Sequence, residues 1–166
     1  MTEVAYTGNI SVKADLTGAT SGGSKKGDVM IGFSCSPENL SFAASSDLPG
    51  FLVMQSGVDA VGGCQDPNAL KLVSGSLSVT EGAGFAEAAR AGISLALSDT
   101  TGSVPPIVRS GLEMKKAEIE AVLGRIEAGD VKVTLKPEAP VGIDQIMGAA
   151  IMGESAVMKV IGFSAE

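Results

Sequence analysis

The residues best placed to do chemistry lie in the stretch SGGSKKGDVMIGFSCSP, residues 21–37. Two adjacent lysines and Asp28 precede an apolar run that stops at a Ser-Pro pair. Such a stretch could be a phosphate-binding loop, the tip of a hairpin or the rim of an active site. A phosphate loop of the GxxxxGK[ST] type lies between a strand and a helix, but here Ser24 precedes Lys25 and a strand is expected to follow. The phosphate-loop interpretation is therefore disfavoured.

The absence of histidine narrows the possible reactions further. Triads of the Ser-His-Asp type and Cys-His pairs need an imidazole, and the chain has none. General acid and base chemistry would have to use Asp, Glu, Lys, Tyr6 or a thiol. Cys35 and Cys64 stand far apart without CxxC spacing, so we expect two small apolar core residues and neither a zinc site nor a disulfide.

The charge balance argues against nucleic-acid binding. Twelve Lys and Arg residues stand against 19 Asp and Glu residues, which gives a net charge of −7, and no basic block exceeds two residues. The N-terminus lacks the basic region and apolar core of a signal peptide, and the apolar stretch 141–163 carries three charged residues. We therefore expect a cytoplasmic protein that binds neither nucleic acid nor membranes.

The elements that would position these side chains begin with a hairpin. A chain of 166 residues with 45% hydrophobic content predicts one domain, residues 1–166, with one core. Apolar and polar residues alternate over 4–16, which predicts a strand with one buried face, and residues 28–33 predict its partner. The Gly/Ser/Thr-rich residues 17–27 are expected to form a flexible hairpin loop. Ser36-Pro37 then predicts a short helix over 38–46.

The rest of the chain is expected to alternate between strands and helices. Strands are predicted over 51–58, 69–79 and 130–136. Residues 84–97 predict a helix whose second half could instead be a strand, and Ser110 with Glu113 predicts a capping box for a helix that closes at Gly129. A final apolar helix is expected over 143–161, with a strand at 157–163 as an alternative ending. This order favours an α/β or α+β fold in two layers.

Four segments in this chain resemble the formaldehyde-activating enzyme family in order and spacing. They are DVMIGFSCSPENLSFA (28–43), GFLVM (50–54), CQDPNAL (64–70) and GISLALSD with VPP (92–106), and the resemblance spans about residues 25–106. It implies a two-layer α/β sandwich like ribosomal protein S5 domain 2, assembled as a homo-oligomeric ring with sites between subunits. It also implies that formaldehyde condenses with a tetrahydromethanopterin-like pterin as substrate, with no cofactor bound covalently.

The resemblance further implies a set of site residues. The family's catalytic histidine falls on Lys26 in this chain, and its strand aspartate falls on Asp28. A desolvated lysine can add to a carbonyl and form an imine, and Asp28 could orient that amine or a pterin amide. Asn68 and Asp99 complete the candidate site as cofactor-binding residues, although both occupy sequences that are also typical of turns.

Three hypotheses from different classes follow. The chain could be a one-carbon enzyme with Lys26 in place of histidine, or a catalytically silent relative that binds a pterin-like or other small ligand. It could also be a non-catalytic, self-assembling ring, shell or virion subunit, which its composition favours because it is rich in Gly, Ser and Ala and poor in aromatic residues. In every case we expect a homo-oligomer, because the apolar C-terminal stretch exceeds what one small core must bury.

Overall fold

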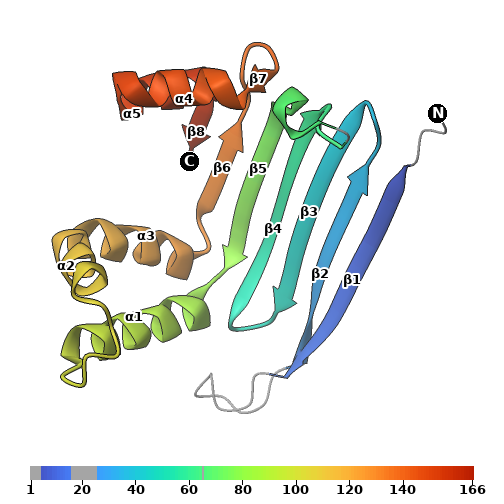
Figure 1. The fold of residues 1–166 in the computed structure, drawn as a ribbon. Helices are drawn as coiled ribbons and strands as arrows, with labels where there is room; N and C mark the ends of the chain where they lie inside the picture. The colour runs from blue at the N-terminus through green and yellow to red at the C-terminus, as the bar shows by residue number, and fades with distance from the viewer. Residues whose placement is uncertain (1–4, 16–25, 65) are drawn as a thin grey trace.

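The computed structural model describes residues 5–15, 26–64 and 66–166, which form a large antiparallel sheet flanked by two groups of helices (Figure 1). The strand order is β1-β2-β3-β4-β5-β6-β8, and β7 pairs with β5. The strands are β1 (Tyr6–Asp15), β2 (Lys26–Cys35), β3 (Asn39–Leu48), β4 (Leu52–Val61), β5 (Lys71–Glu81), β6 (Val131–Leu135), β7 (Val141–Gly142) and β8 (Phe163–Ala165). The helices are η1 (Pro67–Ala69), α1 (Ala83–Ser98), α2 (Pro106–Met114), α3 (Lys116–Ala128), α4 (Ile143–Met152) and α5 (Glu154–Val160). The chain therefore has the mixed helix and strand content that the sequence predicts.

The predicted first hairpin is confirmed. β1 and β2 pair antiparallel over their full length, from Tyr6 opposite Cys35 to Asp15 opposite Lys26. The last two residues of the predicted loop, Lys26 and Gly27, belong to β2, while residues 16–25 lie outside the described part of the chain. The strands predicted over 51–58, 69–79 and 130–136 correspond to β4, β5 and β6.

The helix predicted over 38–46 is wrong, because this segment lies mostly in the interior strand β3. Ser36 forms a tight turn with Asn39: the Ser36 amide donates to the Asn39 carbonyl at 2.8 Å, and the Asn39 amide donates to Ser36 Oγ at 3.1 Å. Leu40 and Phe42 alternate with polar neighbours, and β3 pairs with β2 on one side and β4 on the other. Two flanking strands thus satisfy the backbone, and this outweighs the helix-start signal of the Ser-Pro pair.

The helical predictions are confirmed in part. α1 runs to Ser98, so its second half is not a strand. The helix predicted to start at Ser110 is two helices, α2 and α3, which meet at Lys115; Ser110 lies inside α2, so the capping box is wrong. Gly129 does end α3 in the left-handed conformation, with φ of 67°.

The predicted C-terminal helix is interrupted. Gly153, with φ of 109°, separates α4 from α5, because a backbone with this φ cannot continue a right-handed helix. A strand does follow, but α5 extends to Val160 and the strand β8 begins only at Phe163. Over the described residues, no helix has the length and apolar character needed to cross a membrane.

The helices leave most of the sheet uncovered. α1 and α3 pack on each other, joined by Arg90 Nε to Glu120 Oε2 at 3.0 Å and Arg90 Nη1 to Glu127 Oε2 at 2.8 Å. α1 meets the sheet near its first turn, where the Phe51 and Phe85 rings pack edge to face with centroids 6.4 Å apart. Buried apolar residues in the described chain are few and scattered: Leu48, Ala60, Val79, Ala86, Leu123, Val141 and Ala149.

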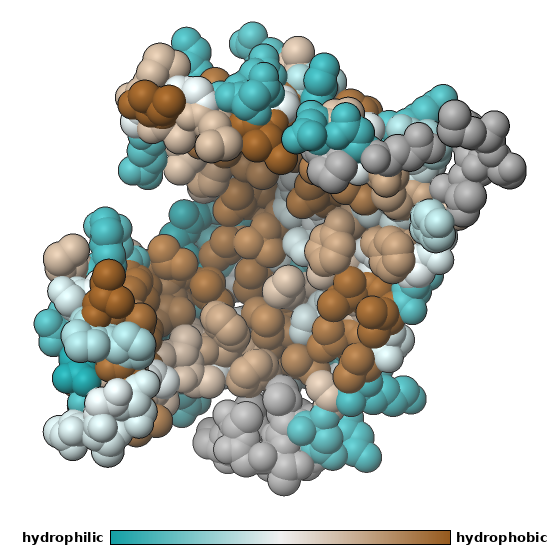
Figure 2. Space-filling view, in the orientation of Figure 1, coloured by the Kyte–Doolittle hydropathy of each residue, from teal (hydrophilic) through white to brown (hydrophobic). Residues whose placement is uncertain are grey.

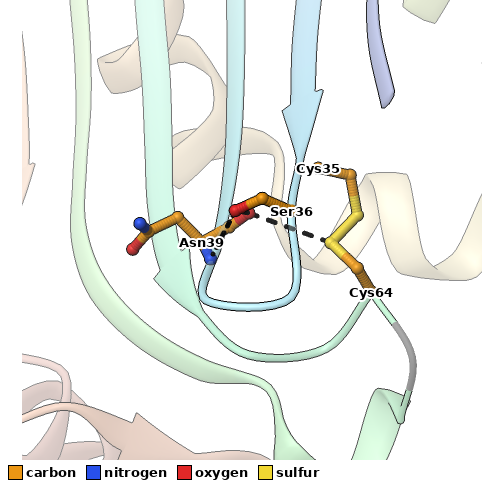
Figure 3. Close-up of a disulfide and its surroundings, with 4 residues drawn as sticks. All are labelled: Cys35, Ser36, Asn39 and Cys64. Carbon is orange, nitrogen blue, oxygen red and sulfur yellow. Dashed lines mark hydrogen bonds between the residues drawn. A yellow bond between two sulfur atoms is a disulfide. The ribbon is translucent and has the colours of Figure 1, made fainter. Parts of the chain in front are cut away.

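The two cysteines form a disulfide, which corrects the expectation of two unlinked core residues (Figure 3). Cys35 ends β2 and Cys64 follows β4, yet their Cα atoms are 5.9 Å apart. The register explains this, since Cys35 lies opposite Leu40 and Leu40 lies opposite Ala60, near the end of β4. The wrong assignment of β3 as a helix concealed this proximity, because only a three-stranded meander brings the two segments to the same end of the sheet.

Candidate functional site

The structure brings two of the four predicted site residues together. Lys26 and Asp28 are both exposed at the start of β2, and a cavity of about 420 Å³ is lined by them together with Lys13, Ala14, Asp15 and Gly27. Asp15 lies opposite Lys26 and Lys13 lies opposite Asp28 in the β1–β2 register. Alternating opposite charges across two strands are typical of a solvated sheet surface. The exposed position of Lys26 does not provide the desolvation that imine chemistry would use.

Asn68 lies at the other end of the sheet. It belongs to η1, after β4, and its amide donates to Asp66 Oδ1 at 2.9 Å in an Asx turn. Lys26 is the first residue of β2 and Cys35 is the last. Cys35 is disulfide-bonded to Cys64, which lies between β4 and β5, as Asn68 does. Because each strand residue advances the chain by about 3.3 Å, the length of β2 separates the two regions by roughly 30 Å.

Asp99 anchors a loop at the end of α1 that points away from the sheet (Figure 1). Its Oδ1 accepts from Thr101 Oγ1 at 2.6 Å and from the Thr101 amide at 2.8 Å, and its Oδ2 accepts from the Val104 amide at 2.8 Å. The hydrogen bond from the Thr101 side chain, followed by those from the two amides and the nearby Arg109 charge, lowers the pKa of Asp99 to about 2. With both oxygens engaged, this carboxylate holds residues 99–104 in place.

A larger cavity, of about 560 Å³, was not predicted from the sequence. It is lined by polar and small residues of β4 and β5, including Asp59 and Ser74, and by the segment 134–140. Ser74 Oγ donates to Asp59 Oδ2 at 3.3 Å, so the carboxylate is already engaged. Within the described residues, no three Cys, Asp or Glu side chains are grouped as metal ligands.

The most distinctive surface is one whole face of the sheet. The register places the even-numbered residues of β1, β3 and β4 on the same side as the odd-numbered residues of β2. We call this side the apolar face, and its large members are Tyr6, Ile10, Val12, Val29, Ile31, Phe33, Leu40, Phe42, Leu48, Leu52, Met54 and Val58, of which Leu48 is buried. No charged residue occupies this face on the four strands. The opposite side, the polar face, carries Thr7, Asn9, Ser11, Lys13, Lys26, Asp28, Ser41, Asp47, Gln55 and Asp59.

The apolar face is open to solvent in the single chain. The exposed fraction is 56% for Ile10, 53% for Val12, 42% for Phe33 and 44% for Phe42. Figure 2 shows apolar side chains over much of the sheet, between and beyond the two helical groups, with paler residues among them. Contiguous apolar surface of this extent on a folded protein marks an interaction site.

The total surface of the chain supports the same conclusion. Its accessible area is 10835 Å². A compact monomer of 16.6 kDa is expected to expose about 7,600 Å², roughly 3,200 Å² less. The alternation in β1 predicts that one face of the sheet is buried. In the described part of the single chain, no second layer of helices or strands covers that face over β1.

The helices carry further exposed apolar side chains. Along α4, Ile143, Met147 and Ile151 recur at four-residue spacing and are 51%, 65% and 89% exposed. Ala149, on another side of the same helix, is buried. We call the three exposed residues the α4 stripe. The sequence predicted this stretch to be more apolar than one small core requires.

Comparisons with known proteins add no family to this description. No protein-family model, curated protein or solved structure matches the chain. The resemblance to the formaldehyde-activating enzyme family therefore stays a prediction. The physical character of the surfaces is the strongest indication of function.

Proposed function

We propose that this chain is a non-catalytic structural subunit that assembles with copies of itself into a closed ring or shell. The observation that carries the proposal is the apolar face, a side of four strands without a charge and with large side chains 40–60% exposed, such as Ile10, Val12 and Phe42. A face of this kind costs free energy in water and is stabilised by a covering layer. The chain's excess surface is large enough for extensive contacts with other subunits.

The polar face fits the outside of such an assembly. Serine, threonine and charged residues of both signs occupy its strands, and the chain as a whole has a net charge of −7. A charged outer surface keeps an assembly soluble and limits further association. The composition, rich in Gly, Ser and Ala and poor in aromatic residues, also favours a structural subunit.

The one-carbon function remains a separate prediction, as do a pterin-like substrate, another small ligand, and a fold like ribosomal protein S5 domain 2. Its candidate residues are divided: Lys26 and Asp28 share one end of the sheet, Asn68 lies at the opposite end and Asp99 is engaged in a loop. A site between subunits could use Lys26 and Asp28 only if assembly covered the polar face. The exposed apolar face favours an assembly that buries the apolar face and leaves the polar face in solvent.

The cytoplasmic location also stays a prediction. The Cys35–Cys64 disulfide bears on it, because such bonds persist mainly in oxidising compartments. A structural subunit that works outside the cytoplasm would be compatible with this bond.

Sedimentation velocity with light scattering over a wide range of micromolar concentrations tests the proposal. We expect a species whose mass is a fixed multiple of 16.6 kDa, with rings or shells visible by negative-stain microscopy. A clean monomer at every concentration would overturn the structural-subunit proposal. Formaldehyde condensation with a reduced pterin by the purified assembly would instead support the one-carbon function.

A further inference from the structure

We infer that the apolar face is covered by the same face of a second copy, sheet against sheet, around a two-fold axis. This inference rests on the proposed function and names the contact that would join subunits in pairs; a second contact would link the pairs into a ring or shell. In such an isologous contact the same patch serves both partners, so it must be complementary to itself. A surface without charges meets this condition, because no like charges are brought together.

The area of the face fits a stable interface. Strands lie about 4.8 Å apart and advance about 3.3 Å per residue, so four strands of ten residues span about 19 by 33 Å, or roughly 600 Å². Two copies together would bury about 1,200 Å² or more, at the lower limit for a specific interface. The excess surface of the single chain, roughly 3,200 Å², exceeds what this contact takes from each copy. The remainder leaves room for additional contacts, for which the α4 stripe is available.

The chemistry of the face favours a second copy over other occupants. A partner must present an extended apolar layer without charges, and the chain itself presents one of matching dimensions. Sheets that pack in this way lie about 10 Å apart, with side chains from the two inner faces interdigitated. Large residues such as Phe33 and Phe42 next to small ones such as Ala44 provide the relief for this. An anionic membrane is a poor alternative, given a net charge of −7.

Two pairs of substitutions on the same strands test the inference. Ile10 lies opposite Ile31 on the apolar face, and Ser11 lies opposite Met30 on the polar face. The test variant combines Ile10→Lys with Ile31→Glu, and the matched control combines Ser11→Lys with Met30→Glu. Each variant places one opposite-charge pair across β1 and β2 and leaves the net charge unchanged. Far-UV circular dichroism verifies that both variants fold.

Sedimentation velocity across a concentration series gives the readout. We expect the apolar-face pair to weaken assembly by at least about 100-fold, because each copy would have to bury two charges in the contact. The polar-face pair is expected to assemble like the wild type. Should the apolar-face variant fail to fold, Val12→Thr with Val58→Thr keeps the β-branched shape and should still weaken assembly by about 10-fold.

The outcomes separate the inference from the proposed function. If the wild type assembles and the apolar-face variants assemble equally well, the face-to-face contact is wrong while the structural-subunit proposal stands. An assembly joined through the edge of β1 or through the α4 stripe would give that result. Loss of assembly in the polar-face variant alone would also overturn the inference. A monomeric wild type would overturn both.

Discussion

The two faces of the sheet are made by the same strands, yet they differ in almost every physical property. Along β1, Ile10 and Val12 point to one side, and Ser11 and Lys13 point to the other. A shift of one residue in register would exchange the two faces completely. Strand alternation therefore identifies which side of a sheet must be covered, but it does not identify what covers that side. In this chain the helices flank the sheet and leave its apolar side open.

The two faces also differ in how they relate to the predicted chemistry. Lys26 and Asp28, the residues that the sequence singled out first, lie on the polar face among alternating charges. The apolar face has no group that could act as an acid, base or nucleophile on β1 to β4 apart from the disulfide-bonded Cys35 and the hydroxyls of Tyr6, Ser46 and Ser56. The predicted chemistry and the proposed association therefore fall on opposite sides of one sheet. Experiments that perturb one side and spare the other can test this separation.

The largest effect is expected from the disulfide at the end of the apolar face. Replacing both cysteines, Cys35→Ser with Cys64→Ser, should destabilise the fold by about 3–4 kcal/mol, because the bond closes a loop with a sequence separation of 29. For a chain of this size that corresponds to a fall in Tm of about 10 °C. Thermal unfolding with and without reductant measures the effect.

The double variant also controls for unspecific effects of the reductant. Reductant should lower the Tm of the wild type and leave the Tm of the double variant unchanged. Assembly measured below its Tm should persist, because the disulfide links segments of one chain and leaves the apolar face intact. Two free thiols in the native wild type, with no effect of reductant on Tm, would contradict the disulfide.

A smaller effect is expected when stability is compared at different protein concentrations. If the apolar face is buried only on association, each tenfold rise in concentration should stabilise the folded state by about 1.4 kcal/mol and raise the wild-type Tm by about 2–4 °C. The Ser11→Lys, Met30→Glu control should show the same slope, and the Ile10→Lys, Ile31→Glu variant should show a nearly constant Tm. If Tm rose with concentration equally in all three proteins, the apolar face would not be the surface that is buried on association.

Much of the fold could be predicted where a single local signal dominates. The alternation over β1 and the glycine that ends α3 were sufficient, because a two-residue period and a left-handed cap each have one structural meaning. The segment at β3 is not predictable from its local sequence, because the helix-start signal at Ser36-Pro37 competes with pairing to the strands on either side. The disulfide was missed for the same reason, since it depends on that pairing.

The candidate site was less predictable than the fold. Lys26 and Asp28 are close because they lie two residues apart on one strand, which the sequence predicts. Their exposure depends on which helices and strands cover the sheet, and the sequence does not give this. For Asn68 and Asp99 the sequence allows either a cofactor-binding role or a role in a turn. Their hydrogen bonds support the role in a turn. The exposed apolar face could not be foreseen, because sequence periodicity does not report where the helices pack.

The smallest effect is expected at Lys26, on the polar face. We expect Lys26 to react with limiting formaldehyde and borohydride at the same rate as exposed lysines elsewhere, such as Lys116 and Lys136, because its position on the polar face gives it no special desolvation. Peptide mass mapping over a time course measures the relative rates, and Asp28→Asn should leave them unchanged. Lys115, which is ion-paired with Glu118 at 2.8 Å, serves as an internal reference for a restrained amine. If Lys26 were labelled first, and Asp28→Asn abolished that preference, the polar face would hold a reactive amine, and the one-carbon function would become the better account of Lys26 and Asp28. Equal rates would leave the apolar face as the functional side of the sheet.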